Sequence, residues 1–199
     1  MFMQTHLKLA RVIYQTVQKD QPDVLDYASF LVGNVLPDFD RRMLPFPHFK
    51  DQSFGYLVDF IQQYRGIPAD NREMYRFSCD MGMIAHFICD YFCQAHNYSE
   101  YENLWHHILY ETQMINAVAS IPVDKLAEMS SRVREPVRVE SVWQLPDFID
   151  FSHQQYKKEE RDINTDIVCS LKAAATVITT TINYNLGREL AKESYALCG

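Results

Sequence analysis

Histidines and acids recur at helical spacing in the segment FSCDMGMIAHFICDYFCQAHN, residues 77–97. His86 and Asp90 are four residues apart, which places them about 40° from each other on one helix face. His96 comes ten residues after His86, about 80° round and near the expected end of the same helix. Imidazole nitrogens and carboxylate oxygens are ordinary zinc ligands. The segment therefore predicts a metal site whose first ligands are held at a fixed separation by one helix.

A second pair of the same kind lies in LWHHILYETQ, residues 104–113, where His107 and Glu111 are again four apart. The four-residue partner of His106 is Tyr110, a poor metal ligand, so the spacing selects His107. A single HxxxD or HxxxE on a helix is ordinarily an exposed or locally paired polar contact. Here the first pair lies in a largely apolar helix, where a charge is costly unless it is paired or metal-bound. Two such pairs within 26 residues favour a metal site.

Upstream residues are available to complete this site. Asp38 lies in GNVLPDFD, at a helix end followed by a turn, and His48 follows in PFPHFK. His6 lies on the apolar stripe of the first expected helix. Several helices and one loop would thus converge on one centre, which is a natural way for a helical bundle to form a polar site.

Helical periodicity dominates the chain, and no run of alternating apolar and polar residues competes as a strand. We expect an all-α fold of about seven or eight helices, the second capped by Asp23 and the fourth by Asp70 or Asn71. A proline-rich turn occupies residues 36–48. The expected helices cover approximately residues 6–17, 23–33, 49–64, 70–96, 99–114, 122–135, 146–160 and 162 onward.

Composition narrows the class of protein. The 199 residues are enough for one domain, expected over 1–199, and linkers rich in Pro, Gly and Ser are absent. The formal charge of −7 disfavours binding of a nucleic-acid backbone. Five cysteines without a CxxC motif predict reduced thiols, with Cys89 and Cys93 in the core. We find no secretory signal and no unbroken apolar run long enough to cross a bilayer, so we expect a cytoplasmic protein with no transmembrane segment.

The pattern HxxxD…H…HxxxE formed by these residues resembles the ligand set of the bacterial zinc-dependent phospholipase C family, whose fold the S1/P1-type nucleases share. The resemblance also includes His6, Asp38 in its G-x-x-x-P-D segment and His48. In motif terms it covers residues 5 to 114, and the C-terminal 85 residues match only in being helical. It implies an all-helical domain that holds three closely spaced zinc ions, and we expect two or three of them in this chain.

The resemblance also implies which residue binds which ion. The first zinc would take Asp38, His48, His86 and Asp90, the second His96, His107 and Glu111, and the third His6 and the other oxygen of Asp90. Glu111 is similar to the phospholipase branch, since aspartate is expected there in the nucleases. Secreted members complete the third site with an N-terminal tryptophan, whereas this chain begins with Met1 and has its first tryptophan at 105. The third site would be rebuilt, for example from a backbone carbonyl near Thr5, or be weak or absent.

The function implied is a zinc-dependent phosphoester hydrolase acting on a phospholipid or another phosphodiester. Closely spaced zinc ions can activate water and clamp the oxygens of an in-line displacement. Asp38, or a carboxylate oxygen near it, is expected to orient or deprotonate the water, and Asp90 to bridge ions and hold their spacing. No stable nucleic-acid complex is expected, and the oligomeric state is left open. The alternatives are a nuclease, phosphodiesterase or phosphatase of the same fold, a metal-binding protein without turnover, and an unrelated helical interaction domain with structural histidines.

Overall fold

The computed structural model describes residues 1–39, 48–64, 66, 68, 70–98, 101, 103–132 and 139–197, without the side chains of 130–132 and 188–197. Every regular element in this part of the chain is a helix, which confirms the all-α prediction. The nine α-helices exceed the predicted number because one turn of helix, α3, forms inside the proline-rich segment. The bounds are α1 Met3–Asp20, α2 Tyr27–Gly33, α3 Leu36–Phe39, α4 Lys50–Gln62, α5 Asn71–Tyr91, η1 Gln94–His96, α6 Leu104–Ser120, α7 Val123–Arg132, η3 Val142–Gln144, α8 Leu145–Tyr156 and α9 Ile163–Leu197.

Local capping explains where several helices begin. The Asp70 carboxylate accepts the Glu73 backbone N–H at 2.8 Å, as the sequence predicts for α5. The cap predicted for α2 is wrong, because Asp26 and not Asp23 accepts the Ser29 N–H. Asp23 has a positive φ of 61° and belongs to the turn before the helix. The sixth helix begins at Leu104 under an Asn103 cap, and its predicted start at residue 99 lies outside the described residues.

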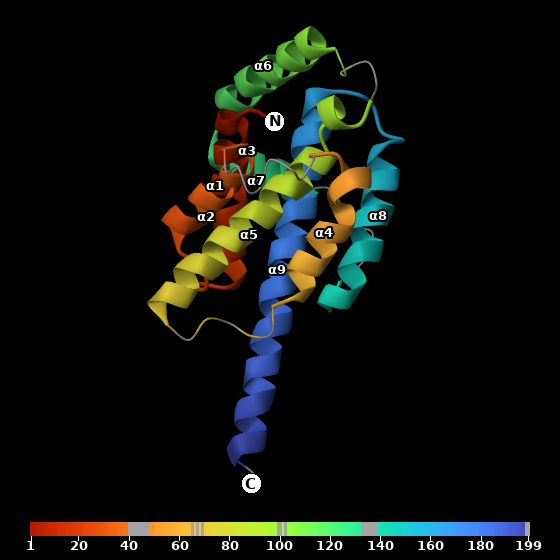
Figure 1. The fold of residues 1–199 in the computed structure, drawn as a ribbon. Helices are drawn as coiled ribbons and strands as arrows, with labels where there is room; N and C mark the ends of the chain where they lie inside the picture. Colours follow the sequence, from red (N-terminus) through yellow and green to blue (C-terminus); the bar gives the residue numbers. More distant parts are fainter. Residues whose placement is uncertain are drawn as a thin grey trace.

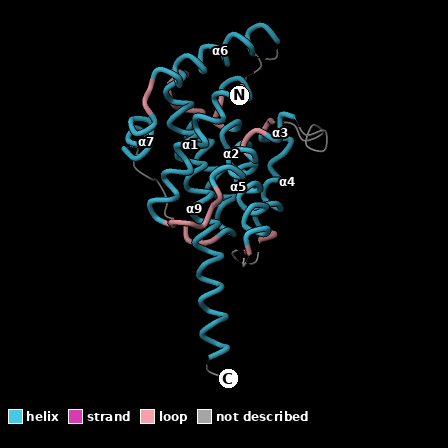
Figure 2. Tube along the Cα trace, turned by 90° about the vertical axis from the view of Figure 1, so that its left-hand side faces the viewer, coloured by secondary structure: helices cyan, strands magenta, loops and turns pink. Residues whose placement is uncertain are grey.

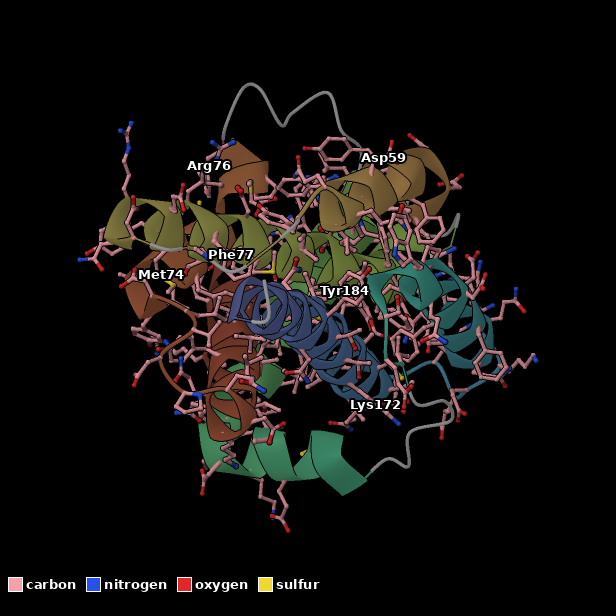
Figure 3. All side chains as sticks on the ribbon, turned by 90° about the horizontal axis from the view of Figure 1, so that it is seen from below. Asp59, Met74, Arg76, Phe77, Lys172 and Tyr184 are labelled. Atoms are coloured by element: carbon pink, nitrogen blue, oxygen red, sulfur yellow. The ribbon has the colours of Figure 1, made fainter. Side chains whose placement is uncertain are left out.

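The long helix α9 forms the axis of the bundle, and α1, α5, α7 and α8 pack directly against it. Seen from below, α9 lies between α1 and the pair α4 and α8 (Figure 3). Helix α6 crosses the end of the bundle where the N-terminus lies, while the last turns of α9 extend past the other helices at the opposite end (Figures 1 and 2). Residues spaced three or four apart along α9 are buried, namely Ile167, Leu171, Ala174, Ile178 and Ile182.

The same helix contains the one candidate membrane span among the described residues. By length and composition, Ile163–Gly187 is apolar enough to cross a bilayer, with a mean hydropathy of 1.2. Of this window, 61% is buried against the rest of the structure, as expected for the central helix of a bundle.

Helices α2 and α5 cross at a very short distance, and two glycines allow it. A Cβ atom added at Gly33 would lie 1.8 Å from the carbonyl oxygen of Cys79. One added at Gly82 would lie 2.2 Å from the carbonyl oxygen of Phe30. These neighbours are backbone atoms that cannot rotate away. The crossing is important for the site, because Asn34 follows Gly33 directly and its side-chain amide donates to the Gly82 carbonyl at 3.1 Å.

We expect Gly82→Ala to lower the free energy of unfolding by about 3 kcal/mol or more, since the added methyl group must push the two helices apart. Urea denaturation followed by circular dichroism measures this loss. Gly55→Ala in α4 is the matched control, because a Cβ there meets no atom within 4 Å. The control should gain up to about 1 kcal/mol from the better helix propensity of alanine. Equal losses in the two variants would contradict the explanation by close contact.

Candidate metal centre

The two residues predicted from α5, His86 and Asp90, are both fully buried. The Nδ1 atom of His86 lies 2.9 Å from the carbonyl oxygen of Asn34. Donation of its proton to this oxygen leaves Nε2 with a free lone pair, the tautomer that a metal ligand requires. Nε2 lies 3.2 Å from Asp90 Oδ2, on adjacent turns of the same helix. The pair therefore has the orientation that its four-residue spacing predicts.

His48 and Asp38 complete a first group around this pair. His48 lies two residues before α4, and its Nδ1 is 2.6 Å from Asp90 Oδ2 and 3.1 Å from His86 Nε2. Asp38, on α3, places Oδ1 3.7 Å from His86 Nε2 and 3.8 Å from His48 Nδ1. The ligand atoms of His48, His86 and Asp90 all lie within 4.8 Å of one another. The structure thus brings together the four residues expected at one ion.

The second group consists of His96, His107 and Glu111, whose ligand atoms also lie within 4.8 Å of one another. Glu111 Oε1 lies 2.9 Å from His107 Nε2 and 3.5 Å from His96 Nε2. His106 is exposed, in agreement with the choice of His107 from spacing. Cys89 and Cys93, which the sequence predicts as core thiols, are free cysteines and buried.

The predicted continuation of α5 to His96 is wrong. The helix ends at Tyr91, and His96 lies in the separate 3-10 turn η1. The Asn97 side-chain amide stabilises this end by donating to the carbonyl oxygens of Tyr91 at 2.8 Å and Cys93 at 2.7 Å. The turn brings His96 Nε2 to 3.5 Å from Asp90 Oδ1, a position that a straight helix would not give it.

His6 and the amino group of Met1 approach the other oxygen of Asp90. His6 Nε2 lies 3.3 Å from Asp90 Oδ1, and its ring stacks on His86 with centroids 3.9 Å apart. Neither ring nitrogen of His6 has a hydrogen-bond partner among the described residues. His6, Asp38 and His86 form a third set with ligand atoms within 4.8 Å of one another.

The Met1 nitrogen, which we did not predict, lies 2.7 Å from Asp90 Oδ1, 3.0 Å from His96 Nε2 and 3.1 Å from Glu111 Oε1. It lies beside the same Asp90 oxygen as His6, the oxygen for which the resemblance left a ligand to be supplied, for example a carbonyl near Thr5. The backbone carbonyl of Asn34 is the other contributor that sequence reasoning missed. Both are main-chain groups, so no residue type indicates them. One clue is the position of His6, five residues from Met1.

The surroundings within the cluster favour ionised Asp90 and Glu111 and a neutral His6. Burial acts to raise the pKa of Asp90, but the Met1 amino group and the nearby histidines outweigh it and hold that pKa well below its ordinary value. Burial also opposes ionisation of Glu111, whose pKa is nevertheless lowered by hydrogen bonds from His107 and His96. Burial lowers the pKa of His6 to about 3. These are the protonation states in which such side chains bind a metal.

The donor set fits zinc. It supplies five imidazole rings and three carboxylates, the ligand types that zinc prefers. Both ring nitrogens of His6 and the buried Nδ1 of His96 lack a hydrogen-bond partner in the described residues, although His6 Nε2 lies 3.3 Å from Asp90 Oδ1. Buried polar groups ordinarily have partners, so a metal ion is a physical reason for such exceptions.

Buried histidines make the metal-free protein sensitive to acid. His153, outside the cluster, lies 2.6 Å from the Asn97 side-chain oxygen, and burial with Lys50 and Lys157 nearby lowers its pKa to about 4. Between pH 6.5 and 4 the unfolded chain binds this proton first, so stability falls as pH falls. His6 acts in the same direction. Asp166, whose pKa burial raises to about 6, opposes them by binding its proton first in the folded state.

We therefore expect the metal-free protein to lose stability from pH 6.5 to 4, because the large lowering of the pKa of His6 and His153 outweighs the raised pKa of Asp166 and the smaller raised pKa values of His48, Asp38 and Asp80. Each group contributes at most about 1.4 kcal/mol per pH unit. Urea midpoints at pH 7, 6 and 5 measure the slope. His153→Gln, whose amide can still donate to Asn97, should make the slope shallower by up to that amount. An unchanged slope in this variant would exclude His153 as a contributor.

The cluster opens to the surface through a pocket of about 510 Å³. Side chains from both groups line it, and the apolar Met3 and Phe39 form part of its wall. A molecule entering from solvent would therefore meet Asp38, His48, His96, His107 and Glu111.

Comparison with protein families gives a match to the model of the family described as zinc dependent phospholipase C, over residues 5–176. The match continues well past residue 114, where the motif resemblance ends, and reaches into the first part of α9. Comparisons with curated proteins and with solved structures give no match. Because the family match covers most of the 199 residues, the chain belongs to the zinc-dependent phospholipase C family.

Proposed function

We propose that this protein is a zinc-dependent hydrolase of phosphoester bonds that acts on a phospholipid. The observation that carries the proposal is the convergence of five histidines and three carboxylates from separate elements beside one pocket. Membership of the family supports the reaction class. Asp38, His48, His86 and Asp90 would hold one zinc ion, His96, His107 and Glu111 a second, and His6 with Asp90 a third.

Asp90 is suited to fix the spacing of this centre. Its Oδ2 faces His48 and His86, while its Oδ1 faces His6, His96 and the Met1 nitrogen. One buried carboxylate therefore joins all three proposed sites. When bound, zinc would supply Lewis acidity for phosphoryl oxygens and lower the pKa of water toward about 7.

Asp38 is suited to accept a proton from water. Its carboxylate lines the pocket and its side chain is 25% exposed, whereas Asp90 is fully buried. Burial raises the pKa of Asp38 above its ordinary value, against the opposing effect of His86. A carboxylate with a raised pKa is a better general base.

The surroundings of the pocket favour a lipid over a nucleic acid. Phe39 at the pocket wall is 64% exposed, and Leu104 and Trp105 on α6, just before His107, are 69% and 77% exposed. Tryptophan is typical of surfaces that meet lipid interfaces. None of the described residues lining the pocket is Lys or Arg, the residues that neutralise nucleic-acid phosphates.

The test is elemental analysis combined with an assay. Zinc-loaded full chain, freed of unbound metal, should contain two or three zinc ions per chain. It should hydrolyse a short-chain phosphatidylcholine, lose this activity to a chelator and regain it with zinc. Single-stranded DNA should be a poorer substrate. Less than one zinc per chain would refute the proposal, whereas full zinc without hydrolysis of any phosphodiester would instead support a metal-binding protein without turnover.

A further inference from the structure

The three residues of the His96–His107–Glu111 group come from two elements: His96 lies in η1, and His107 and Glu111 lie in α6. A metal ligand set requires fixed distances between its atoms, and helix geometry fixes only the pair within α6. Something else must therefore hold η1 against α6. The buried side chain of Asp166, near the start of α9, contacts both elements.

One oxygen of Asp166 joins the two elements directly. Its Oδ2 accepts the backbone N–H of Gln94 at 2.8 Å and the hydroxyl of Tyr110 at 2.6 Å. Gln94 is two residues before His96, and Tyr110 immediately precedes Glu111. The other oxygen, Oδ1, accepts the hydroxyl of Tyr156 from α8 at 2.8 Å. The same carboxylate therefore accepts hydrogen bonds from both elements that supply this group's ligands, including a second one from the Gln94 side-chain amide at 3.4 Å.

A second contact from α9 supports this arrangement. One turn after Asp166, the hydroxyl of Ser170 lies 3.2 Å from the carbonyl oxygen of Cys89 and 3.4 Å from that of Phe92. These carbonyls belong to the end of α5, where the chain leaves the helix toward His96. Helix α9 therefore fixes both the end of α5 and the start of η1.

The burial of Asp166 makes these hydrogen bonds necessary for the fold. Its side chain and those of Gln94, Tyr110 and Tyr156 are all buried. A buried carboxylate is costly unless donors surround it, and here each oxygen has donors. Asp166 is not a member of the metal groups among the described residues. It contacts Gln94 and Tyr110, which lie close to the proposed ligands His96 and Glu111 in the sequence.

We propose that Asp166 is a positioning residue that sets the distance between His96 and the His107–Glu111 pair through Gln94 and Tyr110. The proposal rests on the zinc centre proposed above. Tyr110 and Tyr156 provide a matched comparison, because each donates one buried hydroxyl to Asp166, but only Tyr110 adjoins a proposed ligand.

The experiment titrates metal-free full-length protein with Co²⁺ alone and follows the visible absorption of the bound ion. Tyr110→Phe should weaken cobalt binding at one class of site by about 10- to 100-fold, the usual effect of losing a group that orients ligands. Saturating cobalt should restore the wild-type spectrum. Tyr156→Phe should bind cobalt with an affinity within about twofold of wild type. Because each variant loses one hydrogen bond to Asp166, both should show similar drops in urea midpoint.

Asp166→Asn keeps the size of the side chain and provides a second variant if Tyr110→Phe does not fold. It should weaken the same class of site at least as much. Equal cobalt binding by the two tyrosine variants, with wild-type protein binding normally, would overturn the positioning role alone. Failure of the wild-type protein to bind cobalt would overturn the zinc centre and the positioning role with it.

Discussion

Replacing Asp90 with asparagine is expected to remove bound zinc and phosphoester hydrolysis together. Asparagine keeps one oxygen and replaces the other with an amide N–H₂ donor. In one orientation the amide N–H₂, which cannot bind a metal, faces the ring nitrogens of His48 and His86. In the other orientation it faces the nitrogens of His6 and Met1. We expect zinc content to fall below half that of the wild-type protein and hydrolysis to fall by on the order of 10³-fold, as when a central electrostatic group is lost.

Asp80→Asn is the control for this change. Asp80 lies on the same helix ten residues earlier, accepts a hydrogen bond from Tyr64 and is outside the metal cluster. The same substitution there should leave zinc content and hydrolysis within about twofold, and far-ultraviolet circular dichroism should show both variants folded. Elemental analysis and the phosphatidylcholine assay, run in parallel, make the comparison. If Asp90→Asn retained both zinc and activity, Asp90 would not belong to the centre.

Parts of this site that depend on local helix geometry could be predicted from the sequence. His86 with Asp90 and His107 with Glu111 are neighbours because residues four apart on any α-helix share a face. The same rule predicts His107 as the metal ligand in place of its neighbour His106, which is exposed. The apolar face of α9 was predictable for the same reason. These features need no knowledge of the rest of the fold.

Parts that depend on distant contacts could not be predicted in this way. The end of α5 at Tyr91 depends on Asn97 and on Asp166 and Ser170 of α9, far along the chain. Local periodicity continues past that point, so the helix was predicted to reach His96. The approach of α2 to α5 depends on glycines whose role is visible only when the helices are placed.

The upstream residues illustrate the limit of spacing. His6, Asp38 and His48 lie on different elements, and no periodicity relates them to α5. Resemblance to a family singled them out, and the structure places all three beside His86 or Asp90. Long-range positions of this kind follow from topology, which the separation along the sequence does not determine.

Zinc is expected to raise the thermal stability of this protein substantially. The fold holds His86 Nε2 and His48 Nδ1 3.1 Å apart and leaves both ring nitrogens of His6 without a hydrogen-bond partner in the described chain. An ion that binds these atoms in the folded state adds about 4 kcal/mol at a free concentration 1,000 times its Kd. For a chain of this size each 1 kcal/mol shifts Tm by about 2–4 °C, so the shift should be roughly 8–16 °C.

Thermal unfolding with saturating zinc, and then with excess chelator, measures this shift and its reversal. Magnesium should have little effect, because it prefers oxygen ligands in octahedral geometry and this cluster is rich in imidazole nitrogen. Asp90→Asn should lose most of the response to zinc, whereas Gly55→Ala should keep it, since residue 55 on α4 contacts no part of the cluster. An equal shift in Asp90→Asn would mean that zinc stabilises the protein from another site. A ligand that binds the folded state more strongly than the unfolded chain must raise Tm. If saturating zinc produced no shift in the wild-type protein, the folded cluster would therefore not bind the ion more strongly than the unfolded chain does.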